Sequence, residues 1–270
     1  KLVYDAAIRK CDAADGLKDG LISNPTTCRF DPSVLACTSG AGSDCLSKSE
    51  VGALRKLYAD VRTGDGQSIM AGFPVGSELN WESWFTRSDK EVAGGMQEIF
   101  RYMVHEDPEW SWRNFNLDRD YSAMRKLARV IDATDSDLRP FAAHGGKFLM
   151  YHGWEDTALP AGNSIRYFEA ARTKLGAKAS QARLFMIPGQ AHCFGGSGPN
   201  VVDLIGALDK WVEGNTPPER LTSSKYESFI AALTGQPTKL LQTRPVCAWP
   251  KTPHFKGTGD VNSESSFACR

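Results

Sequence analysis

The sequence predicts an α/β fold for the second half of the chain, on two observations. From residue 138 onward, short apolar runs alternate with helical patterns: a strand at 147–152, a helix at 163–175, a strand at 183–187 and a helix at 200–213. Such alternation is typical of βαβ units around a parallel sheet. Asp156 follows the first strand and His192 follows the second. Because catalytic groups in open α/β sheets lie at the carboxyl ends of strands, we expect these two side chains to meet.

Composition limits the class of protein. The 270 residues are 41% hydrophobic, which is enough for one large or two modest globular domains. The formal net charge is zero, with acidic and basic residues interspersed, so no nucleic-acid or anionic-membrane partner is expected. No apolar run approaches the ~20 residues of a spanning helix, and the N-terminus lacks Met and a signal-like segment. We expect a soluble chain that begins inside a longer gene product.

Seven cysteines indicate an oxidising compartment and therefore a secreted or periplasmic location. Six of them form three short-range pairs by position, each bracketing a turn-rich loop: Cys11 with Cys28, Cys37 with Cys45, and Cys247 with Cys269. Cys193, beside His192, remains. It is a free thiol, is bonded to a partner elsewhere, or is a buried inert thiol.

The first cysteine loop is acidic. Asp12, Asp15 and Asp19 lie within eight residues, and two Asp-Gly steps allow the chain to bend around one centre. Oxygen ligands at this density suit Ca²⁺, although the spacing differs from that of an EF-hand. A solvated Asp/Gly turn without metal is the alternative.

The rest of the chain gives weaker signals. Residues 1–9 resemble the end of a helix, and residues 47–62 predict an amphipathic helix that Gly64-Asp65-Gly66 ends. Residues 73–115 are rich in aromatic side chains, which either line a pocket for an aromatic ligand or form the core of a small domain. The Pro-rich segment 216–270 ends in the third cysteine pair, and we expect it to wrap the surface.

A histidine beside a buried carboxylate can act as general base toward a serine. The α/β-hydrolase order is serine, then acid, then histidine, which places the serine upstream of Asp156. No G-x-S-x-G elbow occurs, and the nearest approach, residues 195–199, follows the histidine. We therefore expect the serine on a segment or polypeptide outside this chain, held through Cys193.

Several motifs give the chain a specific resemblance. They are C-D-A-A-D-G-L-K-D-G-L-I at 11–22, F-N-L-D-R-D at 115–120, G-G-K-F-L-M-Y-H-G-W-E-D at 145–156, G-Q-A-H-C at 189–193 and K-G-T-G-D-V-N at 256–262. On these the chain resembles the C-terminal portion of a tannase/feruloyl esterase family member, a family of secreted serine esterases that includes mono(2-hydroxyethyl) terephthalate hydrolase.

That resemblance implies an α/β-hydrolase core with a large lid domain inserted before the catalytic Asp. Residues 1–132 would be the lid with its calcium site, and residues 133–270 the C-terminal part of the core. The family's structural Ca²⁺ site maps onto the carboxylates of Asp12, Asp15 and Asp19 and the carbonyls of Leu17 and Leu21. Asp156 and His192 map onto the catalytic triad. Cys193 maps onto the cysteine that is disulfide-bonded to the one preceding the nucleophile.

The implied activity is hydrolysis of esters of aromatic acids such as gallate or ferulate. Trp84 either packs against the acyl ring or belongs to the core. In the family, hydrolysis of a terephthalate monoester uses a lid arginine. Glu91 falls at that position, which counts against this substrate. Two other classes stay open: a non-catalytic extracellular calcium-binding module, and a metalloenzyme, which the lack of any His near residues 12–19 disfavours.

Overall fold

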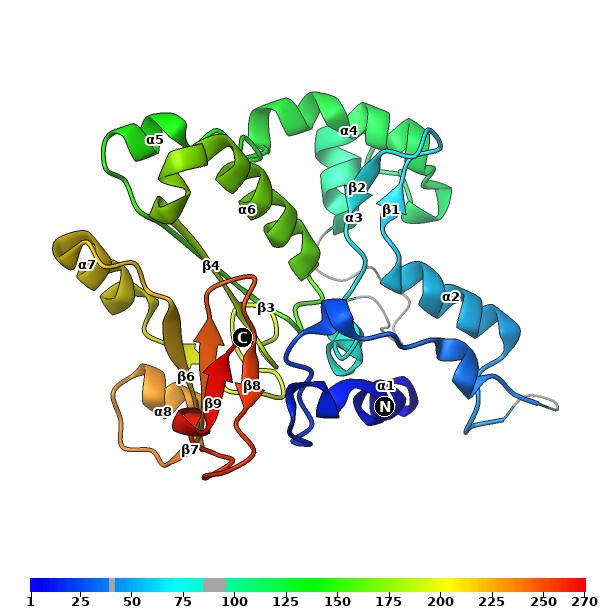
Figure 1. The fold of residues 1–270 in the computed structure, drawn as a ribbon. Coiled ribbons are helices and arrows are strands. Elements are labelled where there is room, and N and C mark those ends of the chain that lie inside the picture. The colour runs from blue at the N-terminus through cyan, green and yellow to red at the C-terminus, as the bar shows by residue number, and fades with distance from the viewer. Residues whose placement is uncertain (39–41, 85–95) are drawn as a thin grey trace.

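The computed structural model of the chain describes residues 1–38, 42–84 and 96–270 (Figure 1). Up to residue 132 the described segments are mostly helical and carry one short hairpin. The main elements are α1 (Leu2–Cys11), α2 (Lys48–Tyr58), β1 (Val61–Arg62), β2 (Ser68–Met70), the 3₁₀ helix η4 (Glu78–Ser83), α3 (Met96–Glu98), the π-helix η6 (Ile99–Val104) and α4 (Leu117–Ile131). Shorter 3₁₀ helices lie at Asp12–Asp15, Pro25–Thr27, Pro32–Leu35 and Trp112–Asn114.

Helix α2 begins where the sequence predicts and ends earlier. Ser47 and Glu50 form a capping box, in which the Glu50 carboxylate accepts the Ser47 backbone N–H at 2.7 Å. The helix stops at Tyr58 instead of continuing to Arg62, because Val61–Arg62 pairs with β2 as a hairpin. Gly66, with φ 88°, takes the left-handed conformation that this hairpin turn needs.

The second part begins with α5 (Arg139–Ala143) and contains a βαβ unit. Strands β3 (Phe148–Gly153) and β4 (Ala182–Ile187) are parallel, in register from Phe148 opposite Ala182 to Gly153 opposite Ile187. Helix α6 (Ala161–Leu175) connects them and lies above the pair in Figure 1. Its buried Phe168 packs in one core cluster with Trp154 and Leu184. The α/β prediction for this region is therefore confirmed.

The C-terminal segment differs from expectation. It does not wrap the surface but builds the strands β6 (Arg220–Tyr226), β7 (Leu240–Cys247), β8 (Pro253–Phe255) and β9 (Phe267–Cys269). Strands β6 and β7 form a three-stranded sheet with β5 (Val201–Val202), β8 pairs with β9, and disulfide Cys247–Cys269 joins β7 to β9. These strands lie below the βαβ unit in Figure 1. Val246 and Ala248 are buried against Phe185 of β4, and the Trp249 N–H donates to Leu184 O at 2.8 Å. The α-helices here are α7 (Leu204–Gly214), which precedes this segment, and α8 (Phe229–Leu233) within it.

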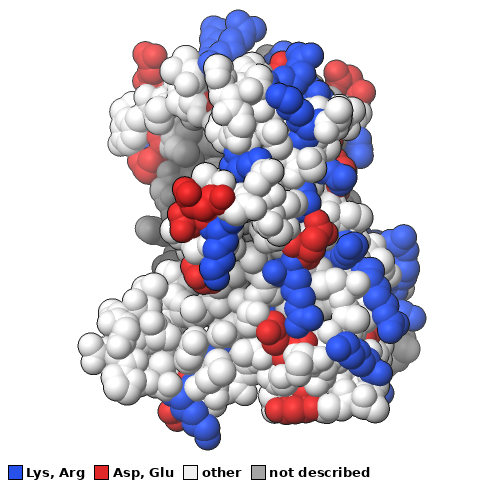
Figure 2. Space-filling view, turned by 60° about the vertical axis from the view of Figure 1, so that its left-hand side comes forward, with Lys and Arg blue, Asp and Glu red and all other residues white. Residues whose placement is uncertain are grey.

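The cysteine pairing follows the sequence prediction. Disulfides join Cys11 to Cys28, Cys37 to Cys45, and Cys247 to Cys269. Cys193 is free and exposed, so the buried-thiol alternative is wrong. In the part of the chain that the structure describes, no helix is both long and apolar enough to cross a bilayer. Figure 2 shows a face on which basic and acidic side chains are interspersed.

Candidate active site

Asp156 and His192 meet at the carboxyl end of the parallel strand pair. Strand β3 ends at Gly153 and β4 ends at Ile187, so the loops that follow leave the sheet at the same edge. His192 Nδ1 lies 2.9 Å from Asp156 Oδ2. The side chain of His192 is 32% exposed and that of Asp156 only 7%. The structure thus brings together the two residues that the sequence selects.

The carboxylate of Asp156 is held ionised by its neighbours. Its Oδ1 accepts the backbone N–H groups of Ala158 at 2.8 Å and Leu159 at 2.9 Å. Burial acts to raise the pKa of Asp156, but hydrogen bonds from His152, the Leu159 N–H and His192 outweigh it and lower the pKa to about 2. A carboxylate that stays charged at neutral pH can orient an imidazole and stabilise its protonated form.

His152 is a site residue that the sequence reasoning missed. Its Nε2 lies 3.3 Å from Asp156 Oδ2 and 2.9 Å from Leu159 O, while its Nδ1 lies 2.7 Å from Ser164 Oγ. The imidazole therefore braces the loop that carries Asp156. The sequence feature that could have identified His152 is its place in the 145–156 motif, four residues before Asp156.

The loop that carries His192 closes on itself. The Gly198 N–H donates to Gly189 O at 2.9 Å and the Ala191 N–H donates to Gly195 O at 3.0 Å. Gly189 has φ 71°, and a Cβ there would come within 2.4 Å of Gly198 N, so the close approach requires glycine. Cys193 also has positive φ, 63°. Within the described ranges, His192 Nε2 has no hydrogen-bond partner.

Ser197, the serine nearest to His192 in sequence, is engaged by another residue. The Ser197 hydroxyl donates to the carboxylate of Glu155, and the Ser197 N–H donates to Glu155 Oε2 at 3.1 Å. The hydroxyl is thus committed to Glu155, which agrees with the interpretation of 195–199 as a glycine-rich turn.

Trp84 lies against the candidate catalytic histidine. The ring centroids of Trp84 and His192 are 5.3 Å apart and their planes meet at 81°, an edge-to-face contact. Trp84 follows η4 directly and is partly exposed. Its position leaves both of its predicted roles available. Glu91 lies outside the described residues.

The acidic loop at 12–19 is folded, and its carboxylates are in use. Asp12 Oδ1 accepts the Asp19 N–H at 3.1 Å, and Asp15 Oδ2 accepts the Ser23 hydroxyl at 2.6 Å. Burial raises the pKa of Asp15, and the nearby charges of Asp19 and Asp12 raise it further. Asp19 Oδ2 pairs with Arg244 Nη2 at 2.6 Å. The loop is therefore ordered and concentrates negative charge.

The fit of a calcium ion to this loop is partial. Across residues 1–38, 42–84 and 96–270, no three His, Cys, Asp or Glu side chains are arranged to hold a metal ion. The available donors are oxygens only, and the partly uncompensated charge around buried Asp15 suits a hard cation. Leu17 and Leu21 would add backbone carbonyl oxygens to the side-chain donors. Calcium therefore stays a prediction.

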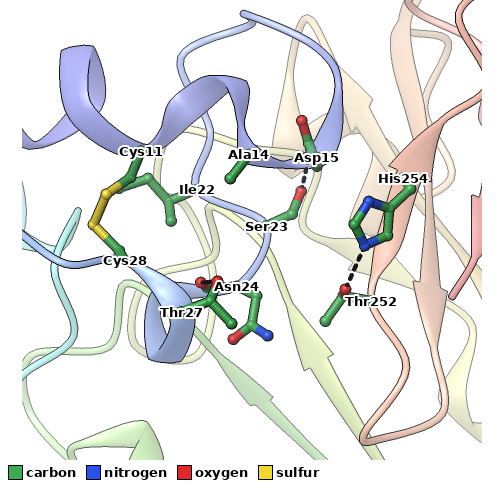
Figure 3. Close-up of a pocket in the computed structure, with 10 residues that line it drawn as sticks. All are labelled: Cys11, Ala14, Asp15, Ile22, Ser23, Asn24, Thr27, Cys28, Thr252 and His254. Carbon is green, nitrogen blue, oxygen red and sulfur yellow. Dashed lines mark hydrogen bonds between the residues drawn. A yellow bond between two sulfur atoms is a disulfide. The ribbon is translucent and has the colours of Figure 1, made fainter.

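A cavity of about 90 Å³ borders this loop, apart from the Asp156–His192 pair (Figure 3). It lies between the Cys11–Cys28 disulfide and the segment leading into β8, and Ser23 reaches from its wall to Asp15. On the opposite wall His254 Nε2 lies 3.1 Å from Thr252 Oγ1. The cavity therefore belongs to the acidic loop.

Comparison with known families and curated proteins gives one consistent answer. The family model described as "Tannase and feruloyl esterase" matches residues 1–270. An uncharacterized esterase of Xanthomonas campestris pv. campestris is 32% identical over 315 residues, covering 99% of this chain and 54% of its own length. Mono(2-hydroxyethyl) terephthalate hydrolase of Piscinibacter sakaiensis is 30% identical over 321 residues, covering 99% and 51%. The chain thus spans about half the length of the curated relatives it matches.

Solved structures agree on the fold. The crystal structure of an esterase from Aspergillus oryzae superposes with a TM-score of 0.89 at 25% identity, covering 100% of this chain and 56% of that one. Tannin acyl hydrolase from Aspergillus niger gives a TM-score of 0.75 at 20% identity, covering 100% and 52%.

Proposed function

The chain belongs to the tannase and feruloyl esterase family, and from that premise we propose that it supplies the histidine and aspartate of a serine carboxylic ester hydrolase. The substrates are esters of aromatic acids of the gallate or ferulate type. The observation that carries the proposal is the 2.9 Å contact between His192 Nδ1 and buried Asp156, at the carboxyl end of two parallel strands.

The proposed chemistry follows from that geometry. Asp156 accepts the Nδ1–H of His192, which fixes the tautomer and leaves Nε2 to take a proton from the attacking serine. The charged carboxylate then stabilises the imidazolium while the tetrahedral intermediate forms. The imidazolium returns the proton to the departing alcohol oxygen, and a water molecule repeats the sequence to release the acid.

The serine is proposed to lie on a segment or chain outside residues 1–270. Two observations support this: Ser197 is engaged by Glu155, and the relatives are about twice as long as this chain. Exposed Cys193, next to His192, is proposed to form the disulfide that links the nucleophile segment to this one.

Trp84 is proposed to pack against the aromatic acyl group. Its edge-to-face contact places it beside the imidazole that must reach the ester. An aromatic side chain at this point offers a flat apolar surface to a gallate or ferulate ring.

The remaining proposals concern architecture and location. Residues 1–132 are proposed to be a lid domain, and residues 133–270 the C-terminal part of the hydrolase core. A structural Ca²⁺ would be held by the carboxylates and carbonyls of the acidic loop: Asp12, Asp15, Asp19, Leu17 and Leu21. The ion would neutralise the loop's charge and take no part in ester cleavage. Three disulfides support a secreted or periplasmic location.

The test compares two histidine substitutions in the complete protein that contains this chain. His192→Ala should lower the hydrolysis of methyl ferulate or methyl gallate by at least about 10³-fold, because the general base is lost. His144→Ala, at an exposed position beyond α5, is the matched control and should keep full activity. Both variants should keep the wild-type fold, as circular dichroism would show. Retained turnover in His192→Ala would rule out the proposed proton transfer from the serine to His192, which Asp156 orients.

A further inference from the structure

Glu155, the residue before Asp156, is a buried acid with a role that the relay does not explain. Its side chain is almost fully buried, with 7% of the residue exposed. Burial raises the pKa of its carboxyl group, and nearby Glu78 adds to the effect, while hydrogen bonds from Ser197 and Asn80 oppose it. Keeping an acid in such a place is unfavourable unless its oxygens do something that a neutral side chain would not.

One set of contacts joins Glu155 to the loop that carries His192. Its carboxylate accepts both the N–H and the hydroxyl of Ser197. Its backbone N–H donates to Gln190 O at 2.9 Å. Together with the Gly198–Gly189 hydrogen bond, these contacts fix residues 189–198 from both ends. Glu155 is therefore bound to both ends of the loop that carries His192.

A second set of contacts joins the same carboxylate to the turn that carries Trp84. Asn80 Nδ2 donates to Glu155 Oε2 at 3.2 Å, and the Thr157 hydroxyl donates to Asn80 O at 3.0 Å. Asn80 is thus hydrogen-bonded to Glu155 and Thr157, the two residues that flank Asp156. Asn80 belongs to η4, and Trp84, whose ring contacts His192, follows that helix directly.

We propose that Glu155 is a positioning residue that fixes the His192 loop and the Trp84 turn relative to each other, so that the base and the aromatic acyl-binding surface are aligned. This inference rests on the proposed esterase function. Glu155 touches neither reacting atoms nor substrate, and it acts through Ser197 on one side and through Asn80 on the other. Asn80 and Glu155 are 75 positions apart in the sequence, so no local motif contains both of them.

The contacts of Glu155 with Ser197 and with Asn80 predict different kinetic effects. Trp84 would contact the acyl ring in both the bound substrate and the transition state, so loosening its turn should raise KM. The His192 imidazole acts on the transition state, so loosening its loop should lower kcat. Asn80→Ala should raise KM about fivefold, and Ser197→Ala should lower kcat about tenfold, as expected for loss of one or two hydrogen bonds.

A conservative variant separates positioning from proton transfer. In Glu155→Gln, the amide oxygen can accept from the Ser197 N–H and from Asn80, while the amide N–H₂ can donate to the Ser197 hydroxyl, which then acts as acceptor. Glu155→Ala loses all of these contacts and should show both kinetic defects. Glu155→Gln should regain most of the lost kcat and KM. A proton-transfer role would leave Gln as defective as Ala.

The experiment measures kcat and KM of the complete protein on methyl ferulate, with Asn116→Ala as the matched control. Asn116 caps α4 and should affect stability without changing KM. The expected result is the split between Asn80→Ala and Ser197→Ala, with rescue by Glu155→Gln. Unchanged KM in Asn80→Ala, or no rescue by Gln, overturns the inference.

An activity-free readout keeps this test separate from the proposed function. The proton between His192 Nδ1 and Asp156 should give a low-field NMR signal in the complete protein. Ser197→Ala and Glu155→Ala should broaden or shift that signal, while Asn80→Ala and Glu155→Gln should preserve it. A wild-type protein that is inactive on aromatic esters would refute the function alone. A signal that is unchanged in Glu155→Ala would refute the positioning role.

Discussion

Asp156→Asn is the substitution whose consequences the structure defines most fully. Asn keeps the size of the side chain, and its Oδ1 can still accept the Ala158 and Leu159 N–H groups. The other carboxylate oxygen becomes an NH₂ group that faces His192 Nδ1, 2.9 Å away in the parent structure. The ring must then present Nδ1 as an acceptor, so its proton moves to Nε2 and the base is lost. We expect kcat to fall about 10⁴-fold at neutral pH.

The effect of the same substitution on the free energy of unfolding follows from the lowered pKa of Asp156. The pKa of Asp156 lies at about 2 instead of its ordinary 3.8, because the hydrogen bonds from His152, Leu159 and His192 outweigh burial. That difference corresponds to about 2 kcal/mol of folding free energy. Because the folded-state pKa is depressed, the contribution is complete above pH ~4 and disappears as pH falls through ~2. Asp156→Asn should therefore lower the free energy of unfolding at pH 7 and converge with wild type toward pH 2.

The assay combines urea unfolding from pH 2 to 7 with methyl ferulate hydrolysis by the complete protein. Asp137→Asn is the matched control. The Asp137 pKa is also lowered to about 2, but by hydrogen bonds from Arg139 at an exposed site. It should leave kcat unchanged. An Asp156→Asn variant that keeps more than about a tenth of wild-type kcat would refute the proposed role of the carboxylate.

Three further predictions test the metal, the link to the remaining segment and the acyl-binding surface. Removal of Ca²⁺ by a chelator should lower the melting temperature, and added Ca²⁺ should restore it, with kcat at low temperature little changed; an unchanged melting temperature would contradict a calcium site at Asp12–Asp19. In the complete protein Cys193 should react with iodoacetamide only after reduction, as mass spectrometry of the peptide would reveal, whereas labelling without reduction would exclude the proposed disulfide. Trp84→Ala should raise KM for methyl ferulate about tenfold through lost aromatic packing, and an equal KM would assign Trp84 to a purely structural role.

The sequence was most informative where local pattern and topology agree. The runs at 147–152 and 183–187 are short, apolar and separated by a helical pattern, so they predicted β3 and β4 and the common edge of Asp156 and His192. The three disulfides followed from spacing because each pair closes a short loop. These features depend on neighbours in sequence or on a general rule of sheet topology.

Other features depend on contacts that spacing does not encode. The helix predicted at 200–213 begins only at Leu204, because Val201–Val202 pairs with a strand more than twenty residues later. The segment from residue 216 looked like a surface wrap because of its prolines. Pro245 nevertheless sits inside β7, opposite Thr222 of β6, and is fully buried. The Asn80–Glu155 contact was missed because it forms only when segments 75 positions apart meet. His152 is near Asp156 in sequence, but only the conformation of the loop after β3 turns its Nε2 toward that carboxylate.

The most direct measurement is the identification of the residue labelled by a serine-reactive fluorophosphonate in the complete protein. Peptide mass spectrometry should place the label on a serine outside residues 1–270, and His192→Ala should abolish the labelling. A label on a serine within residues 1–270, or equal labelling of His192→Ala, would contradict a relay formed by His192 and Asp156 with a serine from beyond this chain.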